Sequence, residues 1–146
     1  MIKLEVRQTE QAKKRGVTVP SYAKEGDAGI DLRSCEDLTI EPGKRAIVKT
    51  GIKIAIPPNF LGLIKDRSGL ASRKGIHTLA GVIDANYRGE ISVVLLNTGK
   101  EDFRIRTNER IAQLLIIPAA KVDLEEVEEL SKTERDEAGW GSTGIT

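Results

Sequence analysis

The sequence lacks the features that mark several classes of protein. It has a single cysteine, Cys35, so no disulfide can form within the chain, and only 3% of its 146 residues are aromatic. We expect Cys35 to be a small buried residue of a protein kept in a reducing compartment. Thiol catalysis is not indicated, because nothing in the sequence near the single histidine, His77, marks it as a partner base.

Long apolar runs and an excess of one charge are missing as well. No stretch approaches the roughly 20 apolar residues that a membrane-spanning helix needs. The N-terminal MIKLEVRQTEQ is too charged for a signal peptide. The formal net charge is +1, which gives no global field for nucleic acid. We therefore expect a cytoplasmic protein with no membrane or nucleic-acid partner.

What the sequence does contain is an apolar pattern with a period of two. In GIKIAI, Ile52, Ile54 and Ile56 share one face of an expected strand. EISVVLLN and IAQLLIIP are more continuously apolar, which is typical of strands covered on both faces. Turn signals such as EPGK, IPPNF and NTGK separate these short runs. The pattern predicts an all-β fold, either a barrel or two packed sheets.

Two segments depart from this pattern. In DRSGLASRKGI, Ser68 is the expected N-cap and Gly75 the expected end of one short helix. The free backbone N–H groups at its start suit an anion. After Leu130 the periodicity ends. We therefore expect a β-sheet domain over residues 1–130 and a flexible C-terminal arm over residues 131–146.

Polar groups before residue 92 allow two interpretations each. GVIDANYRGEI is expected to form a hairpin with Asp84 and Tyr87 at its mouth, where turn chemistry or a ligand explains them. Asp31, between Ile30 and Leu32, is either a surface acid or a carboxylate held for a purpose. The arginine, serine and glycine that open the expected helix suit phosphate oxygens, although structural helix starts look similar.

The second half of the chain adds two further candidates. Gln113 lies among apolar residues on both faces of its strand and needs a hydrogen-bond partner, either backbone or ligand. The arm carries an arginine, a tryptophan and two hydroxyl groups between glycines. It is either a disordered tail or a segment that folds over a ligand.

Five motifs, in this order, make the chain similar to the trimeric dUTPase family, which hydrolyses dUTP to dUMP and pyrophosphate. They are PSYAKEGDAGIDLRS, DRSGLASRKG, GVIDANYRGEI, RIAQLLIIP and TERDEAGWGSTG. The resemblance implies a jelly-roll-like β-barrel or sandwich, Mg²⁺ as cofactor, and a homotrimer in which the arm of one subunit closes over a neighbour's site. The implied role is to remove dUTP from the DNA precursor pool and to supply dUMP for thymidylate synthesis.

The resemblance also implies roles for individual residues. Asp84 matches the carboxylate that activates the water attacking the α-phosphate, and Tyr87 matches the aromatic residue that packs against the deoxyribose. Asp31 matches the carboxylate that holds Mg²⁺ through water. Trp140 matches the residue that stacks on uracil, where a phenylalanine is usual. The other implied substrate contacts are the uracil-edge positions Gly81, Val82 and Ile83, the phosphate positions Arg67, Ser68, Gly69 and Gln113, and the arm positions Arg135, Gly141, Ser142 and Thr143.

The arm departs from the pattern of that family. Glycines are usual where this chain has Asp136 and Ala138, and Glu137 adds a second acid beside Arg135. Two carboxylates there oppose a triphosphate or compete for the arginine. Asn86, where an aspartate is common, tolerates the same turn backbone.

Two alternatives to dUTP hydrolysis remain. Deoxycytidine triphosphate deaminases share the implied fold but depend on a glutamate at the position of Val94, and valine cannot carry the protons of deamination. A binding module that has kept the fold without catalysis is the other alternative. One observation argues against lost catalysis, namely the joint presence of Asp84, Tyr87, Arg67, Gln113 and Arg135.

Overall fold

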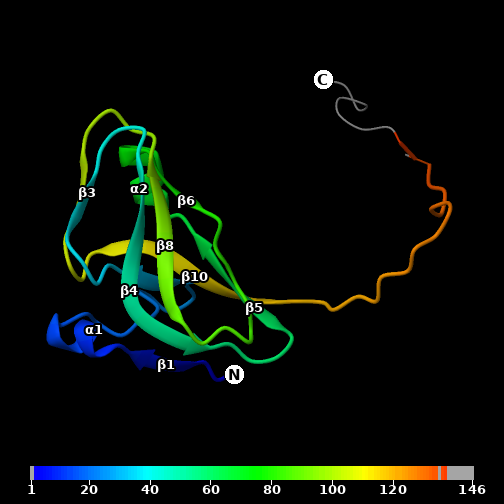
Figure 1. Ribbon diagram of the computed structural model, residues 1–146, viewed down its shortest axis with the longest axis horizontal. Helices are drawn as coiled ribbons and strands as arrows, with labels where there is room; N and C mark the ends of the chain where they lie inside the picture. Colours follow the sequence, from blue (N-terminus) through cyan, green and yellow to red (C-terminus); the bar gives the residue numbers. More distant parts are fainter. Residues whose placement is uncertain (1, 135, 138–146) are drawn as a thin grey trace.

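The described part of the chain folds into two packed four-stranded β-sheets, a smaller two-stranded sheet and two short helices (Figure 1). The computed structural model describes residues 2–134 together with residues 136 and 137. The elements, in chain order, are β1 (Glu5–Gln8), α1 (Glu10–Lys14), β2 (Ile30–Arg33), β3 (Leu38–Ile40), β4 (Arg45–Ala55), β5 (Phe60–Lys65), α2 (Ser68–Lys74), β6 (Ile76–Leu79), β7 (Val82–Ile83), β8 (Glu90–Asn97), β9 (Phe103–Ile105) and β10 (Arg110–Pro118).

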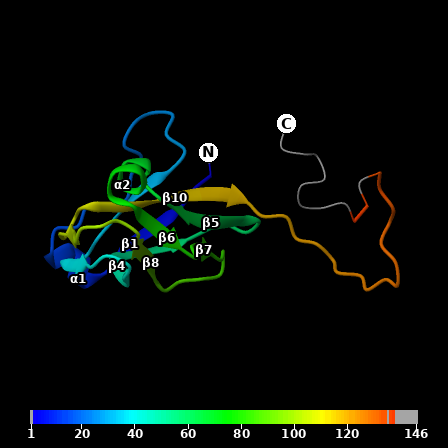
Figure 2. The same ribbon diagram turned by 90° about the horizontal axis from the view of Figure 1, so that it is seen from above.

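The two larger sheets have the strand orders β1-β4-β8-β6 and β2-β10-β5-β7, and β3 pairs with β9 in a third, smaller sheet. The pairings between strands are antiparallel. Figure 2 shows β10 and β5 in one layer and β4 and β8 in the other. The described chain is mostly β-strand, which confirms the all-β prediction. Because the sheets are open rather than closed, the architecture is a sandwich and not a barrel.

The larger of two apolar clusters lies between the sheets and explains the period-two pattern. Ile52 and Ile54 of β4 and Ile56 just after it are all buried, as expected. Strand β8 alternates between buried and half-buried residues, so within one chain only one of its faces is fully covered. Cys35 is buried beside Ala12 and Val17, which confirms its expected structural role.

Helix α1 is an element that the period-two pattern does not predict. The Thr9 side chain caps it by accepting a hydrogen bond from the Ala12 backbone N–H. Glu10 lies in its first turn and two lysines lie in its last turn, which suits the helix dipole. These short-range signals are present in the sequence, but a five-residue helix is too short to show a helical period.

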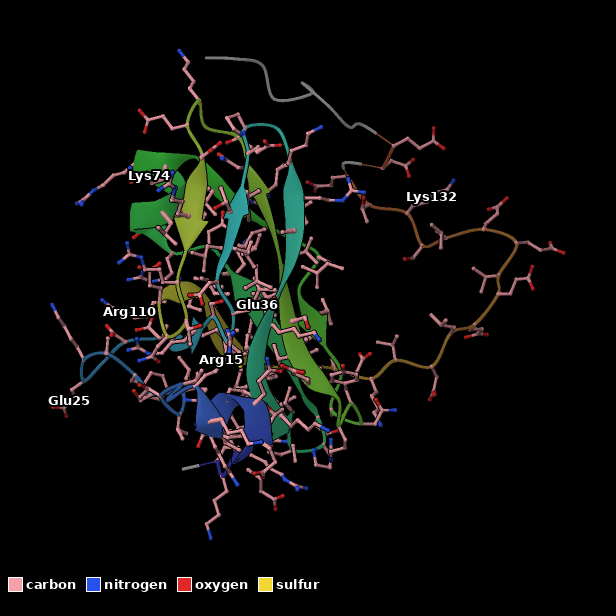
Figure 3. All side chains as sticks on the ribbon, turned by 60° about the vertical axis from the view of Figure 1, so that its left-hand side comes forward. Arg15, Glu25, Glu36, Lys74, Arg110 and Lys132 are labelled. Atoms are coloured by element: carbon pink, nitrogen blue, oxygen red, sulfur yellow. The ribbon has the colours of Figure 1, made fainter. Side chains whose placement is uncertain are left out.

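The chain leaves the sheets after Pro118, where β10 ends (Figure 1). The residues described beyond that point contain no strand or helix. Lys132, labelled in Figure 3, lies on this outlying segment. Four apolar side chains on the segment are exposed, namely Val122, Leu124, Val127 and Leu130. None of the helices in the described part of the chain is long and apolar enough to cross a membrane.

Asn97, at the end of β8, joins three segments through one fully buried amide. Its Nδ2 donates to the carbonyl oxygens of Ile40 and Glu101, both at 2.8 Å, and its Oδ1 accepts from the Gly99 N–H at 2.9 Å. The residue therefore ties the β8–β9 turn to the end of β3.

We expect Asn97→Ala to lower the free energy of unfolding by roughly 2–4 kcal/mol, because buried backbone groups then lose their partners. Urea unfolding at a fixed protein concentration measures this. Thr39→Ala, an exposed change on neighbouring β3, is the control and should stay within about 0.5 kcal/mol of the parent. An Asn97→Ala midpoint equal to that of the control would show that the amide network is not needed.

Candidate active site

Strand pairing brings several expected site residues together. Asp31 on β2 lies opposite Gln113 on β10, and Gln113 lies opposite Lys65 at the end of β5. The chain then runs through Asp66 and Arg67 into α2. We call Asp31, Arg67, Arg110 and Gln113 the Asp31 cluster. Figure 3 shows Arg110 on the flank from which the loop carrying Glu25 projects.

Asp31 is a held carboxylate rather than a free surface acid. Its side chain is only 15% exposed and lies between two guanidinium groups. Arg67 Nε is 3.5 Å from Asp31 Oδ1, and Arg110 Nη1 is 3.2 Å from Asp31 Oδ2. Arg67 Nη1 also donates to the carbonyl oxygen of Arg110 at 3.1 Å. These contacts orient both arginines on one side of the sheet.

Gln113 has a backbone partner in this chain. Its Nε2 donates to the carbonyl oxygen of Asp66 at 2.8 Å. Gly29 lies directly against the side-chain amide, and a Cβ at that position would overlap the Gln113 Oε1. The lack of a side chain at Gly29 therefore leaves room for the Gln113 amide beside the Asp66 carbonyl. Of the two interpretations that the sequence allowed, the backbone partner is confirmed.

The helix start differs from expectation by one residue. Ser68 is the first residue of α2, and Arg67 is the N-cap, with φ −82° and ψ 123°. Gly75 ends the helix in the left-handed conformation at φ 67°, as expected. A Cβ on Gly69 would meet open space, so packing within the chain does not require a glycine there.

The segment around Asp84 is a crossing between sheets, so the expected hairpin is wrong. Strand β7 pairs with β5, whereas β8 pairs with β4 and β6. Both edges of β8 are already occupied, and the two residues of β7 cannot pair with it. The turn after Asp84 therefore carries the chain from one sheet to the other.

This turn is firmly closed. The Tyr87 N–H donates to the Asp84 carbonyl oxygen at 3.1 Å, and Arg88 Nη1 donates to the carbonyl oxygens of Ala85 at 2.6 Å and Tyr87 at 2.8 Å. The Tyr87 hydroxyl donates to the Glu90 carbonyl oxygen at 3.0 Å, which lays the ring over Gly89. A Cβ on Gly89 would overlap the phenol oxygen.

Strand β7 forms the open edge of its sheet beside this turn. Gly81 precedes it at φ 121°, where a Cβ would collide with the Ile64 carbonyl oxygen, and the Gly81 carbonyl accepts from the Ile64 N–H at 2.8 Å. Val82 is exposed, and Ile83 packs against the core. A groove of about 650 Å³ adjoins the turn, and its lining combines apolar residues with the polar or charged Asn59, Asp84, Asn86, Arg88 and Lys121.

One chain does not bring Asp84 to the Asp31 cluster. Ile83 lies opposite Gly62, so Asp84 falls beside Leu61, four residues along β5 from Lys65. Asp31 is three strands away from β7 in the sheet. At about 3.3 Å per residue and 4.8 Å per strand, the backbones at Asp31 and Asp84 are roughly 20 Å apart. The remaining expected contacts, Arg135, Trp140, Gly141, Ser142 and Thr143, lie outside the described residues.

Asp66 is a half-buried, hydrogen-bonded carboxylate that the sequence did not reveal. Its carboxylate accepts hydrogen bonds from His77 and Thr78 on β6. Burial raises the pKa of Asp66, but the hydrogen bonds from His77 and Thr78 outweigh burial and hold this pKa below its usual range. The only sequence signal is the single histidine, and nothing local links residue 77 to residue 66.

A metal ion has no preformed cage here. The described residues contain no group of three or more His, Cys, Asp and Glu side chains placed to hold one. Asp31 faces two arginines, so direct ligation would compete with both ion pairs. The carboxylate suits contact with Mg²⁺ through water, with phosphate oxygens as the inner ligands.

Comparison with known proteins points to one family. The dUTPase family model matches residues 15–144. The deoxyuridine 5'-triphosphate nucleotidohydrolase of Clostridium tetani is 47% identical over 133 residues, which cover 90% of this chain and 92% of that protein. The protein of the same name from Alkaliphilus metalliredigens is 49% identical over 129 residues, which cover 87% and 90%.

Solved structures agree with this relationship. The Staphylococcus bacteriophage 80alpha dUTPase with dUpNHpp superposes with a TM-score of 0.90 at 29% identity, covering 99% of this chain and 100% of that chain. A mutant dUTPase from phage phi11 of S. aureus, described with a structural Mg(II) ion, gives a TM-score of 0.80 at 26% identity, covering 90% and 100%.

The chain therefore belongs to the dUTPase family and has its jelly-roll-like fold. It is a dUTP diphosphatase, a hydrolase of nucleotide metabolism that converts dUTP to dUMP.

Proposed function

We propose that hydrolysis proceeds by Mg²⁺-assisted attack of water on the α-phosphate of dUTP, at sites completed between the subunits of a homotrimer. The observation that carries this proposal is the separation of roughly 20 Å between Asp84 and Asp31 within one chain. One water molecule and one triphosphate cannot engage both carboxylates over that distance. A second copy of the chain therefore supplies the missing half.

The base is read by the open edge of β7. The backbone of Gly81, Val82 and Ile83 faces the uracil edge, which offers an N3–H donor and an O4 acceptor where cytosine offers the reverse. A site built for one pattern leaves buried polar groups unpaired with the other, which rejects it by roughly 10⁴-fold. The closeness of the backbone excludes the extra methyl group of thymine.

The sugar is read by Tyr87. Its ring, held over Gly89 by the hydrogen bond to the Glu90 carbonyl, packs against the deoxyribose and leaves no room for a 2′-hydroxyl. The adjoining groove, with its mixed apolar and polar lining, suits the nucleoside.

The phosphates contact Arg67, Ser68, Gly69 and Gln113. The open space beside Gly69 leaves room for a phosphate close to the backbone. When bound, Mg²⁺ neutralises phosphate charge and keeps the reacting atoms in line, and Asp31 contacts its water shell.

Asp84 acts as the general base. It orients a water molecule and accepts its proton while the water oxygen bonds to the α-phosphorus. The bond from that phosphorus to the bridging oxygen breaks, and pyrophosphate leaves. Positioning and charge stabilisation supply most of the acceleration in such a reaction.

Exposed apolar groups support the trimer. On the outer face of β4, Ile47 is 67% exposed and lies opposite the half-buried Val94 of β8. A second copy that covers this face would bury both residues. The exposed apolar side chains of the segment after Pro118 suit contact with a neighbour in the same way.

The arm, residues 131–146, closes over a neighbour's site, where Trp140 stacks on uracil and Arg135, Gly141, Ser142 and Thr143 clasp the phosphates. The domain before it spans residues 1–130. In a cytoplasmic setting the reaction removes dUTP from the DNA precursor pool and supplies dUMP for thymidylate synthesis.

The proposed mechanism is tested by pyrophosphate release from dUTP, dCTP, dTTP and UTP in parallel, with and without Mg²⁺. We expect release from dUTP alone, because the site recognises both the uracil edge and the deoxyribose. We expect this release only with Mg²⁺, because the ion neutralises the phosphate charge. Asp84→Asn is the control and should bind dUTP but lose most turnover. Release from dCTP or UTP at a comparable rate would contradict the proposed recognition, and near-normal turnover of Asp84→Asn would remove Asp84 from the mechanism.

We expect Gly89→Ala to impair selection against UTP by displacing the Tyr87 ring. Gly89 is not in the left-handed region, so alanine is compatible with the backbone and the urea midpoint should change little. The ratio of kcat/KM for dUTP over UTP should fall about tenfold. If the effect acts through the ring, adding Gly89→Ala to Tyr87→Ala should cause no further loss. Fully additive losses would refute that coupling.

A further inference from the structure

One carboxylate joins the two sheets at the end of β5. Asp66 directly follows β5 in one sheet, whereas His77 and Thr78 lie on β6 in the other. Asp66 Oδ2 is 2.7 Å from His77 Nδ1, and Asp66 Oδ1 accepts from the Thr78 N–H at 2.7 Å and from the Thr78 hydroxyl. Thr78 is buried, so its two bonds to Asp66 are partly sheltered from water, whereas the contact with His77 is exposed.

The protonation states follow from the contacts. The hydrogen bonds keep the pKa of Asp66 below its usual range, so at neutral pH this carboxylate only accepts. His77 Nδ1 must therefore carry the proton that lies between the two side chains. Three donors on β6 thus converge on a single anion.

The same residue lies next to the Asp31 cluster. The Asp66 backbone carbonyl accepts the hydrogen bond of Gln113 Nε2. The next residue, Arg67, makes the ion pair with Asp31 and the hydrogen bond to the Arg110 carbonyl. The backbone at residue 66 therefore determines where the Gln113 amide points and where the Arg67 side chain starts.

We propose that Asp66 is a positioning residue that, by anchoring its own backbone to β6, holds Gln113 and Arg67 in the arrangement that receives the triphosphate. This inference rests on the proposed function, in which both residues contact phosphate. The side chain of Asp66 faces β6, so its effect on substrate passes through these two neighbours.

Asp66→Ala removes the acceptor of all three bonds and should raise the KM for dUTP and the Kd for dUpNHpp about tenfold, with kcat within about threefold of the parent. Asp66→Asn keeps an oxygen for the Thr78 donors, and its amide can donate to His77 once the ring proton moves to Nε2. We therefore expect Asn to restore KM to within about threefold. A general loss of structure would not raise KM while leaving kcat nearly unchanged, and the Asp66→Asn variant would not correct it.

Asp37→Ala is the matched control. Asp37 also accepts a bond from a distant backbone N–H, that of Thr107 at 2.7 Å, but it contacts no member of the Asp31 cluster in the described structure. Its KM should match the parent. Folded Asp66→Ala with an unchanged KM would overturn the inference, as would equal losses in Asp66→Ala and Asp37→Ala.

Two milder variants cover the case in which Asp66→Ala does not fold. His77→Ala and Thr78→Val each remove one bond to the carboxylate, and each should raise KM about threefold. No rise in either folded variant would overturn the inference. Turnover of the parent protein distinguishes the two proposals. Failure of the parent to hydrolyse dUTP would refute the proposed function. Normal turnover of the parent, with an unchanged KM in the variants, would refute only the role of Asp66.

Discussion

Strand β5 pairs with β10 on one side and with β7 on the other. These pairings determine where Gln113, Asp31 and Asp84 lie. Their register places Gln113, and through it Asp31, at one end of β5 and Asp84 at the other. No side-chain movement spans the roughly 20 Å between the backbones at Asp31 and Asp84. The chain therefore holds Asp31 and Asp84 far apart on one sheet, which is why we propose that each site is completed by a second subunit.

At the proposed phosphate-binding end of β5, two carboxylates have different structural roles. Asp31 faces outward between two arginines and keeps their charges oriented before substrate arrives. Asp66 faces β6 and ties the start of α2 to the opposite sheet. Preorganised cations need no rearrangement when a triphosphate binds, which is how electrostatic stabilisation becomes effective. In the proposed mechanism, Asp31 and Asp66 thus support the binding of the triphosphate by orienting the cationic and amide groups around it.

Features of the fold that depend only on residues close together in the sequence were predicted correctly. The alternating isoleucines of β4 and the left-handed end of α2 at Gly75 followed from period and from glycine's conformational freedom. The hairpin expected after Asp84 was wrong, because strand order depends on which partners occupy β8 and not on the turn residues. Asp66 and its bond to His77 could not be seen, since two sheets must pack before residues eleven apart in sequence meet. The site roles came from the joint order of five motifs, which no single motif could supply.

The most direct test of this account is complementation between Asp84→Asn and Arg67→Ala, co-expressed with different tags and purified as a mixed assembly. Each variant alone should lose most dUTP turnover. If Asp84 and Arg67 of one site come from different subunits, a mixed trimer should recover about one third of the parental turnover, because one of its symmetry-related sites then holds both residues. Turnover no higher than that of the separate variants would contradict the account and would place a complete site within one chain.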